Sequence, residues 1–253
     1  MSPLAISLII FACVFGGAII GLMLHRILPE HHLSTETKDV VKLGMGLVAT
    51  MSALVLALLI ASAKGSYETQ SGEVVHMSAG FVQLDRVLQH YGPETAAARA
   101  LLRKTVTTAI NLIWSDNGYQ TNALDSRALQ AEGSQFFEMI ENLTPRDDAQ
   151  RSLQSQALTI ASDLGNTRLL LIEQARGTIA MPFLVVLVFW LTMIFLSFGL
   201  FAPSNTTVIA VLLVCAMSVS GAIFLVLELD RPFTGVMQIS SAPMRDALAH
   251  LGG

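Results

Sequence analysis

The amino-acid sequence predicts an all-α integral membrane protein with four transmembrane helices and a helical extramembrane domain between spans 2 and 3. Three observations predict it: a low content of charged residues, long runs without charge, and helical spacing of apolar residues in the remaining part. Of the 253 residues, 53% are hydrophobic and 13% are charged, whereas soluble domains carry about 25% charged residues. The mean hydropathy is +0.59.

The charged residues are also unevenly distributed. Of 34 charged side chains, 23 lie between Lys64 and Thr178. This distribution excludes a soluble cytosolic enzyme. The net charge is −4, whereas nucleic-acid-binding domains are typically basic, so we expect no nucleic-acid partner.

Four apolar runs are long enough to cross a bilayer. Residues 4–24 form 21 uncharged residues, about 31 Å of helix. They lack the basic flank of a signal peptide, so we expect a retained span. A second run covers 43–63. Residues 177–227 hold no Asp, Glu, Lys, Arg or His and are too long for one crossing. The Pro/Ser/Asn segment 202–207 predicts a turn, which gives further spans at 179–201 and 207–227.

Four spans place both termini and the segment 64–178 on the same side of the membrane. Five basic residues lie near span ends on that side, namely Lys64, Arg168, Arg176, Arg231 and Arg245. Three lie on the other side, namely Arg26, Lys38 and Lys42. The excess predicts that the large domain faces the cytoplasm. We therefore expect four segments: 1–63 with spans 1 and 2, a helical cytoplasmic domain at 64–178, spans 3 and 4 at 179–228, and a tail at 229–253.

The extramembrane segment shows helical periodicity and no strand alternation. A core face is predicted at Val74, Met77, Phe81, Leu84 and Leu88. Gly92-Pro93 should end that helix, and a second should run to about Trp114. We expect a third helix over about 122–143. Thr144-Pro145-Arg146-Asp147 reads as an N-cap, a proline at the first helical position and an acid two residues later.

The fourth helix of this segment should present one apolar face, formed by Leu153, Ala157, Ile160, Leu164 and Leu171. It should continue into the third span almost without interruption and bend at Pro182. Similarly, the second span should run through Gly65 into the helix 66–90. Two long helices would then connect the membrane to the cytoplasmic domain.

The second span carries small side chains on one face. Ala49, Ala53, Ala57 and Ala61 recur every four residues, and the same face includes Gly46, Thr50 and Lys64. Small residues permit close helix packing, and they could instead line a narrow pore with Thr50 facing water. The sequence leaves both interpretations open. On the first span, Gly17-x-x-x-Gly21 is typical of a helix contact.

No span contains an ionisable residue near its middle. Buried intramembrane charges are typical of proton-coupled transport, so the pattern favours passive conduction or a role without transport. We also find no catalytic motif, and we expect no enzyme activity and no cofactor. His25, His31, His32 and Glu36 could bind a metal, but their spacing matches no helical ligand pair, so we expect no metal site.

The tail holds a polar motif where the fourth span leaves the membrane. In Leu229-Asp230-Arg231-Pro232-Phe233-Thr234-Gly235, Asp230 and Arg231 suit an interfacial ion pair, while Pro232 and Gly235 should turn the chain. A structural corner is the simpler interpretation. Asp230 could alternatively hold a lipid headgroup or a partner helix.

This tail, with Val236-Met237-Gln238-Ile239-Ser240 after it, resembles the C-terminal signature of the bestrophin-like bacterial membrane proteins, a family defined by a domain of unknown function. Ala63-Lys64-Gly65-Ser66-Tyr67-Glu68 is similar to the family's pattern at the end of the second span. The helix that begins at Glu73 and ends at Gly92-Pro93-Glu94 is also similar to the family's pattern. The resemblance covers nearly the whole chain.

The resemblance implies a remote relation to bestrophins, which are pentameric anion channels whose second membrane helix lines a central pore. It implies a bacterial inner-membrane protein, a homo-oligomeric ring of about five protomers and an inorganic ion as ligand. The sequence departs from bestrophins in two places. The aromatic-rich neck on the second span is replaced by Ala and Leu, and no acidic calcium-clasp loop aligns. We therefore do not expect the calcium gating or the anion selectivity of bestrophins in this protein.

Two functions remain open. The first is an oligomeric channel with a pore lined by the second span. The second is a non-conducting sensor or scaffold, whose spans anchor it in the lipid while its cytoplasmic helices bind a partner. The number of protomers discriminates between them, because a monomer or dimer has no ring axis for the second span to line.

Overall fold

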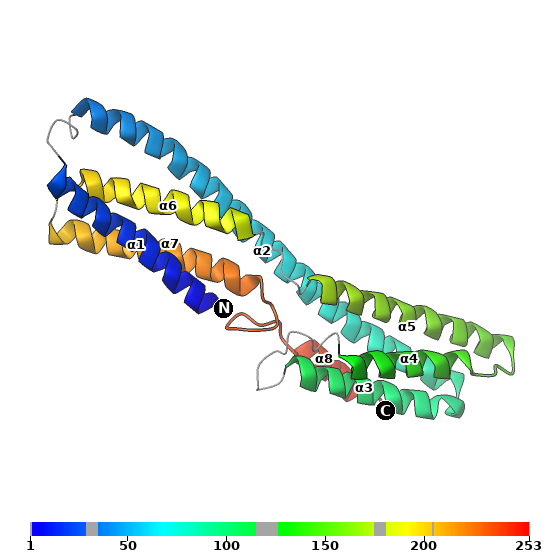
Figure 1. Cartoon of the computed structure of the whole chain (residues 1–253). Coiled ribbons are helices and arrows are strands. Elements are labelled where there is room, and N and C mark those ends of the chain that lie inside the picture. The colour runs from blue at the N-terminus through cyan, green and yellow to red at the C-terminus, as the bar shows by residue number, and fades with distance from the viewer. Residues whose placement is uncertain (1, 29–34, 115–125, 175–180, 204, 253) are drawn as a thin grey trace. The chain divides into compact units, whose positions relative to one another are not determined.

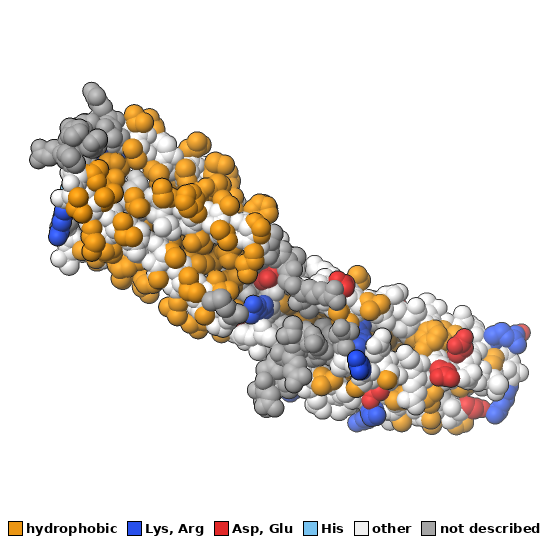
Figure 2. Space-filling model, in the orientation of Figure 1, with side chains coloured by type: hydrophobic (Ala, Val, Ile, Leu, Met, Phe, Trp, Pro, Cys, Tyr) orange, Lys and Arg blue, Asp and Glu red, His pale blue; other side chains and the backbone are white. Residues whose placement is uncertain are grey.

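The computed structural model describes residues 2–28, 35–114, 126–174, 181–203 and 205–252 (Figure 1). These residues are helical apart from short turns and connections, and no strand occurs among them. The chain divides into two compact units. One contains residues 1–65 and 178–230, and the other contains 66–177 and 231–253. Hydrophobic side chains cover the visible face of the first unit, and most charged side chains lie on the second (Figure 2).

The first unit is built from four helices. They are α1 (Pro3–Ile27), the first part of α2 (Thr35–Tyr91), α6 (Met181–Phe201) and α7 (Thr206–Leu229). In the described part of the chain these four helices are long and apolar enough to cross a membrane, which confirms the four predicted apolar helices. The predicted break between the last two is also confirmed. The side chain of Asn205 caps α7 by accepting a hydrogen bond from the N–H of Val208 at 2.8 Å.

Helices α1 and α6 approach closely through glycines. A Cβ atom at Gly21 would overlap the backbone carbonyl of Leu196, and one at Gly199 would overlap the carbonyl of Ala18. A Cβ at Gly17 would lie 2.9 Å from the carbonyl oxygen of Thr192. The helix contact predicted for Gly17-x-x-x-Gly21 is therefore confirmed, and its partner is α6.

Helix α2 is continuous over 57 residues. The expectation that the second span runs on through Gly65 is therefore confirmed. Its longest segment without a charged side chain is 43–63. The second part of α2 carries the predicted face Val74, Met77, Phe81, Leu84 and Leu88, all buried.

The second unit packs this polar part of α2 with five further elements. They are a short 3-10 turn (Pro93–Thr95), α3 (Ala96–Ile113), α4 (Arg127–Glu141), α5 (Asp148–Gln174) and α8 (Ala242–His250). Their core contains Val106, Ile110, Phe136, Ile140 and Leu164. As predicted, α2 ends before Gly92, whose φ of 134° lies in a region that favours glycine.

The start of α5 differs from the prediction. Helix α5 begins at Asp148 rather than after Thr144, because the carboxylate of Asp147 accepts the N–H of Gln150 at 2.7 Å and so caps the helix. Helix α4 begins at Arg127, since the side chain of Ser126 accepts the N–H of Leu129 at 3.3 Å. The predicted start at Asn122 falls among residues outside the described part.

The predicted apolar face of α5 is confirmed. Ala157, Leu164 and Leu171 are buried, and Leu153 and Ile160 are partly buried against the same core. The predicted continuity of this helix with the third span concerns residues 175–180, which lie outside the described residues. Helix α6 begins with Met181 before Pro182.

A buried ion pair ties α2, α3 and the C-terminal segment together. The guanidinium of Arg99 donates to both carboxylate oxygens of Asp85, at 2.8 and 2.9 Å. Gly252 donates its N–H to Asp85 at 3.3 Å, and Arg103 donates to the carbonyl of Leu251 at 2.6 Å. Burial opposes the charged form of Asp85, but the bonds from Arg99 and Gly252 and the charges of Arg99 and Arg103 outweigh it and hold its pKa below the ordinary value.

We expect Asp85→Asn to destabilise the protein by about 3–5 kcal/mol at pH 7, because it removes the buried carboxylate to which the largely buried guanidinium of Arg99 donates two hydrogen bonds. A carboxyl with a lowered pKa contributes stability above its unfolded-state pKa, and this stability is lost as the pH falls through the folded-state pKa. The difference between wild type and Asp85→Asn in thermal unfolding should therefore be full at pH 7 and shrink as the pH falls below about 4.

The exposed ion pair between Asp148 and Arg151 provides the control. Asp148→Asn should change thermal unfolding little, because exposed pairs contribute weakly. A wild-type-to-Asp85→Asn difference that stays constant between pH 7 and pH 3 would contradict the assignment.

Candidate functional site

The membrane part of α2 is the least buried of the four apolar helices. In its most apolar window only 6% of residues are buried, against 33% for α1, 33% for α6 and 22% for α7. A membrane helix that its own chain leaves uncovered must contact lipid, water or another protomer. Its side chains therefore form the candidate site.

One strip of α2 packs onto the rest of the unit. Ser52 and Ala63 are buried, at 3% and 1% exposure. Val55, Leu56 and Leu59 are partly buried against the core of α1, α6 and α7. The hydroxyl of Ser52 donates to the carbonyl of Val48 at 2.8 Å, so this polar group is satisfied within the helix.

The exposed remainder of α2 divides into two strips of different side-chain size. The large apolar strip consists of Val40, Leu43, Leu47, Leu54 and Leu58, which are 66–78% exposed, together with Met51. The small strip consists of the predicted residues Gly46, Thr50, Ala53, Ala57 and Lys64, all exposed. Because these positions follow the helical period, each strip runs along the helix. Large apolar side chains suit lipid tails, whereas the small strip leaves room beside the helix.

The predicted small side chains therefore lie on one face of α2. The two outer alanines of the predicted repeat differ from each other in exposure. Ala61 is exposed like Ala57, but Ala49 is half-buried. The large side chains of this part of α2 are also divided between the surface and the interior of the unit. Met51 and Leu58 are exposed, whereas Val55 and Leu59 pack inward.

The polar character of the small strip is concentrated at Thr50. Its hydroxyl donates to the carbonyl of Gly46 at 2.9 Å, so the hydrogen is used within the helix and the oxygen lone pairs remain for an outside partner. No charged side chain occurs in α2 between Lys42 and Lys64. The strip is therefore uncharged up to Lys64 at its end, over about one membrane thickness.

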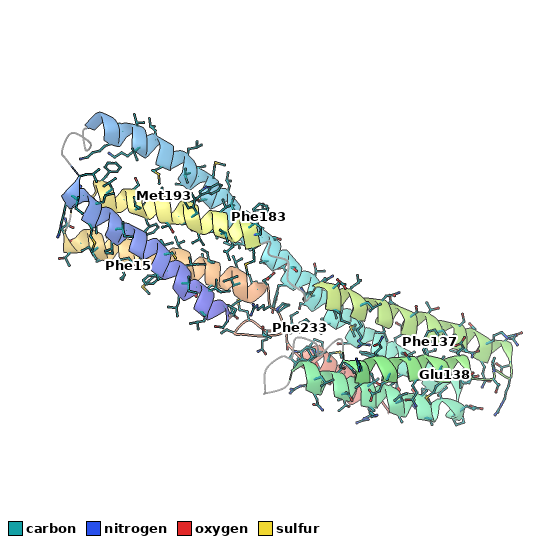
Figure 3. All side chains as sticks on the ribbon, viewed as in Figure 1. Phe15, Phe137, Glu138, Phe183, Met193 and Phe233 are labelled. Carbon is teal, nitrogen blue, oxygen red and sulfur yellow. The ribbon has the colours of Figure 1, made fainter. Side chains whose placement is uncertain are left out.

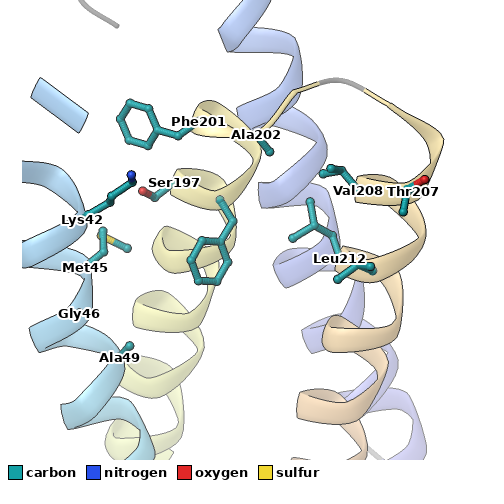
Figure 4. A pocket seen from close by; sticks show the side chains of 12 residues that line it. Lys42, Met45, Gly46, Ala49, Ser197, Phe201, Ala202, Thr207, Val208 and Leu212 are labelled. Atoms are coloured by element: carbon teal, nitrogen blue, oxygen red, sulfur yellow. The ribbon is translucent and has the colours of Figure 1, made fainter. Parts of the chain in front are cut away.

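A cavity of about 510 Å³ borders the Lys42 end of the strip. Gly46 lines it together with Lys42, Met45 and Ala49, and α6 and α7 supply the facing wall (Figure 4). Lys42 and Ser197 point toward one another there. Gly46 thus faces space inside the unit as well as the surface.

The tail motif forms a turn anchored in the second unit. Asp230 caps the end of α7, and Gly235 has a φ of 86°, as the expected chain reversal requires. Phe233 is buried at 4% exposure (labelled in Figure 3) and meets the ring of Trp114 edge to face at 6.1 Å. The indole N–H of Trp114 donates to the carbonyl of Ile239 at 2.8 Å. The motif therefore turns the chain at the end of α7, and its anchors Phe233 and Trp114 were not predicted as such.

A comparison with known protein families matches residues 12–244 to the Bestrophin-like domain. The match covers most of the sequence and includes the second span and the tail motif. The chain belongs to the Bestrophin-like family. A search of curated proteins found no match.

The fold of this bestrophin-like chain is similar to that of a solved structure, a point mutant of a bacterial bestrophin homologue from Klebsiella pneumoniae. The TM-score is 0.64, the identity is 14%, and the alignment covers 96% of each chain. At this identity the similarity shows the fold alone. Family membership and four apolar helices make the protein a membrane protein of channel-like type.

The candidate metal ligands of the first loop lie mostly outside the described residues. His25 is described, and its Nδ1 lies 2.8 Å from the carbonyl oxygen of Leu200, which joins the ends of α1 and α6. Within the described part of this bestrophin-like chain, no three His, Cys, Asp or Glu side chains gather as a metal site would require.

Proposed function

We propose that the protein is an oligomeric ion channel of the bacterial inner membrane, with a pore lined by the small strip of α2. The observation that carries this proposal is the 6% burial of the α2 window, far below that of the other spans. Family membership supports a channel-like protein in general. The strip identifies which residues would face the pore: Thr50, Ala53 and Ala57, with Gly46 and Lys64 toward its ends.

The different side-chain sizes on α2 support an axial arrangement. If copies of α2 surround an axis, the small strip leaves an open path there, and the large apolar strip can contact neighbours or lipid. The opposite orientation would fill the axis with Leu43, Leu47 and Leu54 and leave alanines facing lipid tails, where small side chains make fewer contacts. We take the number of protomers as about five by analogy with bestrophins.

The absence of charged side chains between Lys42 and Lys64 favours passive flow of ions over tight binding of ions. Conduction requires ions to leave their sites as readily as they enter. The excess of basic residues near the span ends on the side of residues 64–178 supports a cytoplasmic position for this segment.

Cysteine accessibility tests the pore-lining strip. Ala57→Cys and Leu58→Cys are compared after Cys13 and Cys215, the two free cysteines, are replaced by serine. Only a thiolate reacts, and a thiol in lipid does not ionise. We expect a membrane-impermeant charged methanethiosulfonate to modify the Ala57→Cys variant and to leave Leu58→Cys unmodified. Equal modification of both variants, or modification of Leu58→Cys alone, would contradict the proposal.

A further inference from the structure

The cavity at the Lys42 end of α2 lies among the apolar helices of the first unit. Its volume is about 510 Å³, within the range of about 300–1,000 Å³ typical of small-molecule sites. Phe198 of α6 and Val211 of α7 line it and are 51% and 55% exposed, so the cavity opens onto the surface of the unit beside them. The hydrocarbon core of a bilayer contains no water. An opening among membrane helices is therefore accessible to acyl chains.

The lining is apolar except near one end. Its large apolar side chains are Met45, Phe198, Phe201, Val208, Val211 and Leu212. At one end lie Lys42, which directly precedes the uncharged segment 43–63, and Ala202, which follows the last residue of α6 (Figure 4). The ends of membrane-spanning helices lie at the level of the lipid headgroups. A fitting occupant therefore has an apolar chain in the cavity and a polar group at the Lys42 end.

The charge of Lys42 selects the sign of that polar group. Lys42 is exposed and has no ion-pair partner among the described residues. Asp39, the acid closest to it in the sequence, does not line the cavity. A lysine at the end of a span lays its apolar stem along the helices and places its ammonium group among the headgroups. This position favours an anionic lipid over a zwitterionic one.

Ser197 supplies a second polar contact in the cavity. It lines the cavity, is only 9% exposed, and points toward Lys42 (Figure 4). Thr192 on the same helix donates its hydroxyl to the carbonyl of Val188 at 2.8 Å, whereas Ser197 has no hydrogen-bond partner among the described residues. A buried hydroxyl without a partner is costly. An oxygen atom of a bound lipid, in its phosphate or ester groups, would remove that cost.

We propose that this cavity binds an anionic phospholipid. One acyl chain lies between α2 and the helices α6 and α7, the phosphate contacts Lys42, and the hydroxyl of Ser197 donates to a lipid oxygen. The bound lipid packs against α2, the least buried of the four apolar helices. The site is formed by a single protomer, so the proposal does not depend on conduction or on the number of protomers.

The test counts the lipids that the full-length protein retains. Protein in mild detergent is delipidated and then incubated with equal amounts of phosphatidylglycerol and phosphatidylcholine carrying the same chains, and native mass spectrometry measures the bound lipids. We expect wild type to be enriched in phosphatidylglycerol. Lys42→Gln should lower this enrichment about fivefold, the effect of one lysine at an anionic surface.

Arg26→Gln is the matched control for charge. Arg26 lies in the last turn of α1, is exposed and does not line the cavity. It is predicted to lie on the same side of the membrane as Lys42. The enrichment should therefore stay as in wild type. Equal losses in Arg26→Gln and Lys42→Gln would show a general attraction of anionic lipid to surface charge and would overturn the proposal.

A second pair of variants tests the chain. Ala49→Phe places a large side chain in the cavity, which Ala49 lines, and should lower the retention of both lipids because it removes space for an acyl chain. Ala61→Phe makes the same change on the same helix outside the cavity and should retain lipid as wild type does. The comparison of Lys42→Gln with Arg26→Gln remains decisive if Ala49→Phe fails to fold.

Three results would overturn the proposal besides equal losses in the two charge variants. Wild type could show no enrichment of phosphatidylglycerol, or folded Ala49→Phe could retain lipid like wild type. Alternatively, a neighbouring copy of the chain could occupy the cavity. In that case wild type would retain no more lipid than Ala49→Phe does, and Ala49→Phe would dissociate the oligomer in the same spectra.

Discussion

Ala53→Trp is expected to abolish ion flux in reconstituted vesicles while the protein still folds. Ala53 lies at the middle of the small strip and is exposed, so a larger side chain there meets no neighbour within its own chain. In a ring, every protomer would project an indole toward the axis at the same level. Several indoles around one axis would fill a narrow pore. Flux should fall to the level of protein-free vesicles, with unchanged elution of the oligomer on size-exclusion chromatography.

Leu54→Trp provides the matched control. Leu54 is the next residue on α2, belongs to the large apolar strip and is 67% exposed. Since Trp is tolerated on lipid-facing or loosely packed surfaces, flux should remain close to wild type. Preserved flux in Ala53→Trp, or a loss of flux in Leu54→Trp alone, would reverse the assignment of the two strips.

Gly21→Val should prevent assembly of the membrane unit. The new Cβ would overlap the backbone carbonyl of Leu196 on α6, and a backbone atom cannot rotate away as a side chain can. Helices α1 and α6 must then separate, with loss of the contacts made by Val14 and Ala18 in the core. Overpacking costs about 1–3 kcal/mol where side chains can relax, so we expect at least the upper end of that range here. The yield of monodisperse protein in detergent measures it.

Gly16→Val is the control for this substitution. Gly16 lies on the same helix one residue before Gly17, and a Cβ there meets nothing within 4 Å. Hydrophobicity and helix propensity change identically in the two variants, so the contact with α6 is the difference between them. Equal yields of Gly16→Val and Gly21→Val would show that the close approach is not needed.

Patterns among neighbouring residues predicted the features that depend only on neighbouring residues. Uncharged runs identified the four membrane helices, the spacing of Gly17 and Gly21 identified a helix contact, and the period of Val74, Met77 and Phe81 identified the core face of α2. The small strip was visible as a repeat of alanines. The predicted start of α5 was wrong, because the carboxylate of Asp147, and not Thr144, is the cap that forms.

Features that join distant parts of the chain could not be predicted. The pairing of Asp85 with Arg99 and Gly252, and the contact of Phe233 with Trp114, depend on how helices assemble. The division of exposed α2 into two strips depends on which side of the helix packs inward. The burial of Ser52 and Ala63 defines that side.

The number of protomers tests the central claim most directly. Native mass spectrometry of the protein, extracted from membranes in mild detergent, counts the copies without assuming that it conducts. We predict a closed ring of about five, in which copies of α2 can share one axis. A monomer or dimer would contradict the channel proposal, because no axis would remain for the small strip to line. The protein would then be better explained as a membrane-anchored scaffold.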